Sequence, residues 1–94
     1  MKTPVGSRVG AISHSDHDTV YMFGFGVYEG DFVPSDEAGG FNLGIPNPRI
    51  RLDSGKVVYG CECWWMPEYQ VKQLIVTRNV VLADIDQVRR RSRS

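Results

Sequence analysis

A glycine-rich stretch in the middle of the chain carries the residues best suited to binding chemistry. Gly39 and Gly40 are adjacent, so their backbone amides are exposed and can receive phosphate or ribose oxygens. Phe41 offers a ring face for stacking, and the side-chain amides of Asn42 and Asn47 can pair with base or sugar edges. Together these residue types predict a site for a nucleotide-type small molecule.

Two arginines follow this stretch directly. Arg49 and Arg51 are two residues apart, so a strand would place both guanidinium groups on one face. Guanidinium forks at this spacing suit a pair of phosphates, which would complete the predicted site. The alternative is a plain loop beside a charged strand face, and the residues themselves favour neither interpretation over the other.

A polar cluster near the N-terminus is the first candidate for a metal site. His14, Asp16, His17 and Asp18 combine imidazole and carboxylate groups, which are both metal ligands. One tight turn rarely points four side chains at one ion, and no other segment supplies an obvious further ligand. The favoured interpretation is therefore a solvated polar turn.

The two cysteines, Cys61 and Cys63, are a weak candidate for the same chemistry. Zinc-binding pairs are usually separated by two to four residues, because that spacing lets both sulfur atoms face the ion. A one-residue gap in a strand sends the side chains to opposite faces, which also disfavours a disulfide between them. We expect two free cysteines, no metal, and a reducing cytoplasmic location.

The sequence contains no recognisable catalytic constellation. Both histidines fall in the predicted turn, and no GxSxG, HExxH or Walker pattern occurs. Asp84 and Asp86 would share a strand face but have no evident acid–base partner. The run Phe23–Gly26 lacks the spacing of a phosphate-binding glycine loop, and no helix start follows it. We expect a non-enzymatic protein without a cofactor.

Hydrophobic periodicity predicts mostly strands and one helix. Strands are expected at residues 7–12, 19–28, 49–52, 56–64 and 80–85, and a helix begins at Met66–Glu68 with Val71, Leu74 and Ile75 as its apolar stripe. Asp53–Gly55 is the expected turn of a hairpin. Gly24 and Gly26 leave one strand face bare, which permits close approach by another backbone, a ring or a ligand.

The expected fold is α+β, with a mostly antiparallel β-sheet, one helix in the C-terminal half and a long glycine-rich loop. Residues 29–47 form that loop, since they contain four glycines and two prolines without a convincing period. Residues 1–88 make up a single domain. Residues 89–94 include four arginines and are expected to be a basic disordered tail, too charged and too short to pack.

Composition narrows the classes of partner. Residues 1–88 hold seven basic and eleven acidic side chains, so a net acidic body makes nucleic acid an unexpected partner. No apolar stretch approaches the ~20 residues of a membrane span, and Met1–Pro4 does not begin a signal peptide. A chain of 94 residues has a thin stability margin, which favours self-association.

Four strings of the sequence resemble a group of short phage and prophage proteins, most of them called hypothetical. These strings are Gly6–Ile12, Phe25–Asp31, Asn47–Gly55 and Tyr59–Trp65. The last string is fairly specific because it contains adjacent tryptophans, and the resemblance covers roughly residues 6–86. The group resembles in turn the phage anti-Thoeris signal sponges of the first described type. This resemblance implies a β-rich homo-oligomer that sequesters a cyclic ADP-ribose isomer or a cyclic oligonucleotide in the host cytoplasm.

The expected function is therefore a non-enzymatic phage anti-defence protein that binds and sequesters a cyclic nucleotide-type immune signal. Its expected binding residues are Gly39, Gly40, Phe41, Asn42, Asn47, Arg49 and Arg51. The alternative is a small protein-binding inhibitor of a host factor, acting through an exposed aromatic face. Trp64 and Trp65 are successive, so in a strand one ring would pack in the core and the other could reach an interface.

Overall fold

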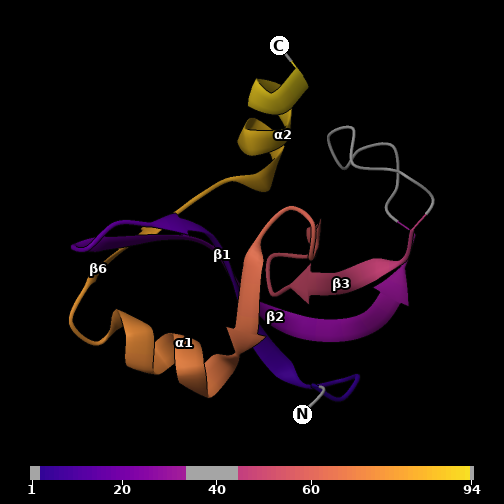
Figure 1. Ribbon diagram of the computed structural model, residues 1–94, viewed down its shortest axis with the longest axis horizontal. Helices are drawn as coiled ribbons and strands as arrows, with labels where there is room; N and C mark the ends of the chain where they lie inside the picture. Colours follow the sequence, from indigo (N-terminus) through magenta and orange to yellow (C-terminus); the bar gives the residue numbers. More distant parts are fainter. Residues whose placement is uncertain (1–2, 34–44, 94) are drawn as a thin grey trace.

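The computed structural model describes residues 3–33 and 45–93, which form a six-stranded sheet with two short helices (Figure 1). The elements, in chain order, are β1 (Arg8–Ser15), β2 (Thr19–Phe32), β3 (Asn47–Leu52), β4 (Val57–Tyr59), β5 (Trp64–Pro67), α1 (Glu68–Ile75), β6 (Asn79–Leu82) and α2 (Ile85–Arg93). The strand order is β4-β3-β2-β1-β5, with β6 paired to β2 off this path. Every pairing is antiparallel except β2–β6, so the prediction of a mostly antiparallel α+β fold is confirmed.

A long hairpin of β1 and β2 is the centre of the sheet. Its turn is held by the Asp16 carboxylate, which accepts hydrogen bonds from the amides of Asp18 (2.9 Å) and Thr19 (2.7 Å). These amide bonds lower the pKa of Asp16. The carboxylate of Asp16 is therefore used to stabilise the turn between β1 and β2. The described residues contain no group of three or more His, Cys, Asp or Glu side chains placed to hold a metal ion.

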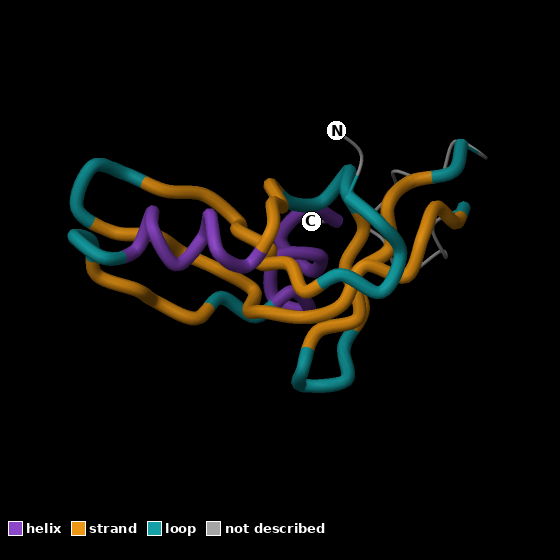
Figure 2. The backbone as a smooth tube through the Cα atoms, turned by 90° about the horizontal axis from the view of Figure 1, so that it is seen from below, coloured by secondary structure: helices purple, strands orange, loops and turns teal. Residues whose placement is uncertain are grey.

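Helix α1 covers one face of the sheet and runs alongside the hairpin (Figure 2). Val71 of α1 is fully buried against Val20 and Met22 of β2. Gly10 makes this contact possible, because a Cβ atom at that position would lie 2.7 Å from a methyl carbon of Val71. The helix can therefore approach the sheet closely over β1.

Helix α2 packs on the larger cluster of buried residues. The cluster consists of Val9, Ala11, Phe23, Ile50, Leu52, Val58 and Ile85. Ile85, the first residue of α2, is almost fully buried within it. Gly26 brings β2 and β3 together beside this cluster, since a Cβ atom there would collide with the carbonyl oxygen of Arg51. The predicted close approach of another backbone is thus confirmed at Gly26, whereas at Gly24 no described atom beyond its chain neighbours lies within 4 Å of where a Cβ atom would be.

The strand predicted over residues 56–64 is wrong at its C-terminal half. Strand β4 ends at Tyr59, and the chain turns before β5 starts at Trp64. The Glu62 carboxylate stabilises the turn by accepting a hydrogen bond from the Tyr59 amide at 3.1 Å. Gly60 fits against the ring of Pro48, where a side chain would not. Cys61 and Cys63 therefore lie in a turn and not in a strand.

The C-terminal predictions also need correction. Strand β6 ends at Leu82, because the Asp84 carboxylate accepts a hydrogen bond from the Asp86 amide (2.9 Å) and begins α2. The residues expected to form a disordered tail are helical as far as Arg93. Arg89 explains the difference, since its guanidinium bonds to both Glu62 carboxylate oxygens at 2.7 Å. This ion pair fastens a charged segment to the fold. Within the described ranges, no helix is long and apolar enough to cross a membrane.

Candidate functional site

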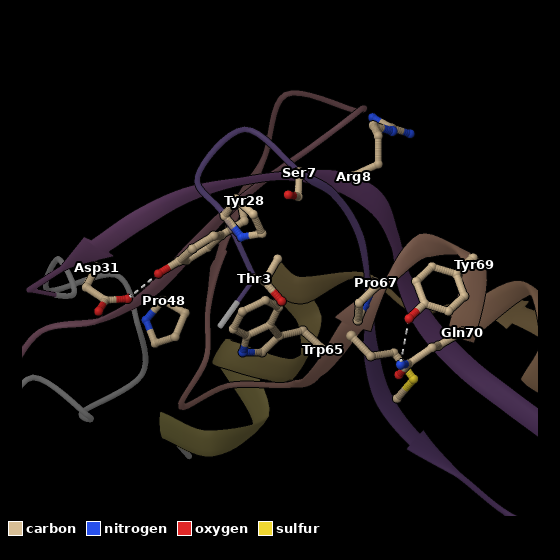
Figure 3. Close-up of a pocket in the computed structure, with 12 residues that line it drawn as sticks. Thr3, Ser7, Arg8, Tyr28, Asp31, Pro48, Trp65, Pro67, Tyr69 and Gln70 are labelled. Carbon is tan, nitrogen blue, oxygen red and sulfur yellow. Dashed lines mark hydrogen bonds between the residues drawn. The ribbon is translucent and has the colours of Figure 1, made fainter. Parts of the chain in front are cut away.

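An open groove of about 1010 Å³ lies where the N-terminal segment, β2, β3, β5 and the start of α1 meet (Figure 3). Three aromatic rings and three prolines make up most of its apolar lining. They are Tyr28, Trp65, Tyr69, Pro4, Pro48 and Pro67. We call this site the aromatic groove. Ligand pockets of such size and apolar character are usual for drug-sized or peptide ligands.

Tyr28 and Trp65 form the centre of the aromatic groove. Their ring centroids are 5.0 Å apart and their planes differ by 24°, so the rings stack. The adjacent Trp64 lies on the other side of β5 with 73% of its surface exposed. The alternation of strand side chains therefore separates the two tryptophans, and Trp65 is the one that reaches the groove.

The polar groups of the aromatic groove lie towards its ends (Figure 3). At one end the Tyr28 hydroxyl donates to the Asp31 carboxylate at 2.7 Å, and this hydrogen bond raises the pKa of Tyr28. At the other end Gln70 donates its amide to the Tyr69 hydroxyl at 3.2 Å. These bonds fix the orientation of two of the three rings.

Arg8 lies at the rim of the groove, with its guanidinium turned away from the rings (Figure 3). It donates to both oxygens of Asp53 at 2.7 Å and to Glu68 at 2.9 Å. The bond to Arg8 lowers the pKa of Asp53, and bonds to Lys72 and Arg8 lower that of Glu68. Because the charge of Arg8 is already met by two carboxylates, the groove presents mainly ring surface to a ligand.

Of the residues that the sequence singled out, Asn47, Arg49 and Arg51 are described by the structure, and none of the three lines the aromatic groove. Gly39, Gly40, Phe41 and Asn42 lie outside the described residues. Asn47 uses its side-chain amide to donate to the Ile45 carbonyl oxygen at 3.0 Å. The described part of the predicted site is therefore reduced to one amide and two arginines.

Arg49 and Arg51 converge on Glu29, which lies across the sheet on β2. Arg49 donates to one carboxylate oxygen at 2.9 Å and Arg51 to the other at 3.1 Å. Arg49 also lies 3.6 Å from the ring centroid of Phe32, which is a cation–π contact. Burial of Glu29 works to raise its pKa, but the bonds and charges of the two arginines outweigh it and lower the pKa. We call these four residues the arginine clamp.

Sequence reasoning missed the aromatic groove because its rings come from three separate elements. The adjacent tryptophans Trp64 and Trp65 are the feature of the sequence that points to this site. Which of the two rings faces the groove depends on how β5 is oriented, and the sequence does not give this orientation. The sequence places Tyr28 on the correct strand but indicates no partner for its ring. Tyr69 falls in the first turn of α1, where nothing in the apolar stripe of the helix marks it.

Both cysteines are free thiols. Cys63 packs against the larger core cluster and donates its thiol to the Tyr59 carbonyl oxygen at 3.4 Å. Burial raises its pKa to about 12, with a smaller contribution from the charge of Glu62. Burial also raises the pKa of Cys61. Neither thiol has the lowered pKa of a nucleophile or of a ready metal ligand.

The thiols should therefore react slowly and unequally with a disulfide reagent. At about pH 8 we expect Cys61 to react more than about tenfold faster than Cys63, since the thiolate is the reactive form. Cys61→Ser should remove the faster phase and leave the slower one. Equal reaction rates of the two thiols in the folded protein would contradict the burial of Cys63. As a control, both thiols should react fast and at the same rate in denaturant.

Comparison with known proteins gave no matching family model, no matching curated protein and no matching solved structure. The fold and the site define the class: a small α+β protein with an aromatic groove on one side of its sheet.

Proposed function

We propose that the protein is a non-enzymatic binding protein whose aromatic groove holds an extended, proline-containing segment of a partner protein. The observation that carries this proposal is the stack of Tyr28 and Trp65 in a groove lined by three rings and three prolines. Proline-rich segments dock in aromatic-lined grooves, because the polyproline II helix is already formed and loses little entropy on binding.

The charges around the groove support a peptide more than a polyanion. Arg8 is bonded to Asp53 and Glu68, so a phosphate would have to compete with two carboxylates for it. At the opposite end, Asp31 is a carboxylate that could meet a basic residue flanking the prolines. The expected ligand is therefore an apolar extended segment with an arginine or lysine at one end.

Such binding would make the protein an inhibitor of a host factor, because occupying a proline-rich segment blocks the partner's own contacts through it. We place this activity in the cytoplasm, where Cys61 and Cys63 would stay reduced.

A nucleotide signal sponge is the second candidate, and the arginine clamp favours it. Arg49 and Arg51 already hold the two oxygens of one anionic group beside the ring of Phe32. A cyclic nucleotide would have to displace the Glu29 carboxylate with its phosphate, as a phosphate would have to displace carboxylates at Arg8, and it could present its base to an aromatic ring. Under this proposal the protein is a phage anti-defence protein that sequesters a cyclic ADP-ribose isomer or a cyclic oligonucleotide.

One thermal-shift experiment separates the two candidates. The panel contains a short oligoproline peptide with an arginine at one end, cyclic ADP-ribose isomers and cyclic dinucleotides. A ligand that binds only the native state raises the melting temperature by mass action. We expect the peptide to raise it and the nucleotides to leave it unchanged. A shift with a nucleotide alone would overturn the peptide proposal and support the sponge, and a chemically altered ligand would contradict both.

Trp65→Ala and Trp64→Ala form a matched pair for the site. Truncating a central tryptophan of an interface typically costs about 2 kcal/mol or more, so Trp65→Ala should weaken peptide binding by about 30-fold or more. Trp64→Ala should bind as the wild type does, since its ring is on the other side of β5. Trp65→Phe keeps a ring in the groove and should recover part of the affinity. If the two alanine variants lost peptide affinity equally, the aromatic groove would not be the peptide-binding site.

A further inference from the structure

Strand β6 has the composition of an interior strand but lies at an edge of the sheet. Among the described residues it pairs only with β2, and all four of its residues are exposed. Its sequence, Asn-Val-Val-Leu, contains no lysine, proline or other feature that normally protects an edge from further pairing. The strand is therefore open to a further strand.

Both faces of β6 are apolar. Val80 and Leu82 lie on the face of α1, beside Val20 and Met22 of β2. Val81 lies on the opposite face beside Tyr21, whose ring stacks on His14 at 4.4 Å. The exposed fraction of the side chains reaches 76% at Leu82. A strand that is apolar on both faces is typical of the interior of a sheet, where neighbouring strands cover it on either side.

The direction of the backbone N–H and C=O groups determines which residues of β6 can form hydrogen bonds with a further strand. The amides of Asn79 and Ala83 donate to carbonyl oxygens of the β2 side, at 2.8 Å each. Successive residues of a strand point their amide and carbonyl groups to alternate edges, so those of Val80 and Leu82 point away from β2. A partner strand would have to bond to these two residues.

We propose that β6 pairs antiparallel with β6 of a second copy of this chain, with Val81 on the two-fold axis. In this register Val80 of one copy exchanges both backbone hydrogen bonds with Leu82 of the other, and Leu82 does the same with Val80. These are the two residues whose polar backbone groups face outwards. The pairing satisfies the same groups on both copies, as a two-fold interface requires.

The charges that flank β6 favour a second copy and this register. With Val81 on the axis, Arg78, which precedes β6 in one copy, comes opposite Asp84, which follows β6 in the other, and this pair of positions occurs twice. Asp84 also bonds to Lys56 of its own copy at 3.0 Å, which extends the network of opposite charges. Opposite charges across an antiparallel pair are stabilising, whereas like charges would be repulsive. Shifting the register by two residues in one direction would place Arg78 opposite Leu82, and in the other direction opposite Asp86, which already belongs to helix α2 and not to an extended strand.

The same two-fold axis brings the apolar side chains together. The axis is perpendicular to the sheet, so Val80 and Leu82 of both copies form one continuous strip on the side of the two α1 helices. Val76, the C-cap residue of α1, is a further exposed apolar residue (77%), three positions before β6 in the chain. The interface therefore covers the exposed apolar residues of β6, and it involves none of the residues that line the aromatic groove.

Sedimentation velocity over a concentration series tests the proposal on the full chain. We expect a reversible dimer for the wild type and a dissociation constant raised by about tenfold or more in Val81→Lys, which places like charges at the axis. Val33→Lys is the matched control, because Val33 is similarly exposed (49%, against 44% for Val81) but lies outside β6. A monomer at all concentrations, or a dimer that is insensitive to Val81→Lys, would overturn the proposal.

A charge exchange tests the register. Arg78→Asp and Asp84→Arg should each weaken the dimer, and the double variant should recover most of the loss, since it restores an opposite pair. The melting temperature of each variant controls for the bonds that Arg78 and Asp84 make within one copy. A dimer in which the double variant is as weak as the sum of the two singles would rule out this register.

Discussion

Replacing Arg89 by alanine is expected to destabilise the fold by about 3–5 kcal/mol, which is the typical cost of leaving one member of a buried ion pair without its partner. Arg89 and Glu62 retain only 12% and 5% of their side-chain exposure. Arg89 also donates to the Val57 carbonyl oxygen at 2.9 Å. The variant should therefore release α2 from the turn between β4 and β5.

Arg90→Ala is the matched control for this prediction. Arg90 lies on the same helix but is exposed, so its loss should change the free energy of unfolding by less than about 1 kcal/mol. Chemical denaturation of both variants measures the difference. If Arg89→Ala were as stable as Arg90→Ala, the ion pair would not fasten the C-terminal segment.

Gly26→Ala is expected to be the most damaging of the small substitutions, at about 3 kcal/mol or more. The added methyl group would collide with the carbonyl oxygen of Arg51, and both groups belong to paired strands. No side-chain rotation can relieve the clash, so β2 and β3 must separate. The destabilisation should appear as a lower denaturation midpoint.

Gly10→Ala distinguishes this backbone clash from a side-chain clash. At Gly10 the obstacle is a methyl group of Val71, which can be removed. Combining Gly10→Ala with Val71→Ala should therefore cost less than the two single changes added together. For Gly26 there is no such compensating partner, and a mild effect of Gly26→Ala would contradict the close packing of β2 on β3.

The hairpins of the sheet could be predicted because they are local. The strand from Thr19 was correctly located, but its predicted end at residue 28 is wrong, because β2 continues to Phe32 and residues 29–32 belong to the strand and not to the predicted loop. Asp53–Gly55 is a turn sequence, so the strands on either side of it followed from spacing. The prediction failed at residues 60–63, where no break in the sequence pattern marks the end of the strand. What ends β4 there is the contact of Gly60 with Pro48 and the bonds made by Glu62, which depend on the folded chain.

Helix α2 could not be predicted for a similar reason. Its sequence has only Ile85 and Val88 as apolar residues, and most of the others are charged or polar. Such a segment is typical of a solvated tail when taken alone. The carboxylate that holds it, Glu62, is 27 residues away in the chain. The burial of Ile85 and the ion pair between Arg89 and Glu62 together hold this segment against the sheet as a helix.

The candidate site shows the same division between local and distant information. The residue types indicated that Arg49 and Arg51 bind an anion together. In the structure both arginines form ion pairs with the carboxylate of Glu29. The aromatic groove depends on Tyr28 lying 5.0 Å from Trp65, which is 37 positions later in the sequence. Pairing of β5 with β1 creates this contact, and no spacing within one segment predicts it.

The measurement that tests the peptide-binding proposal most directly is a ¹⁵N–¹H NMR titration of the two tryptophan indole groups with the arginine-flanked oligoproline peptide. Each indole gives one resolved N–H signal, so Trp64 serves as the control for Trp65 within the same sample. We predict that the Trp65 signal shifts in a saturable manner while the Trp64 signal stays in place. If the Trp65 signal stayed unchanged throughout the titration, or if Trp64 alone responded, the aromatic groove would not be the peptide site.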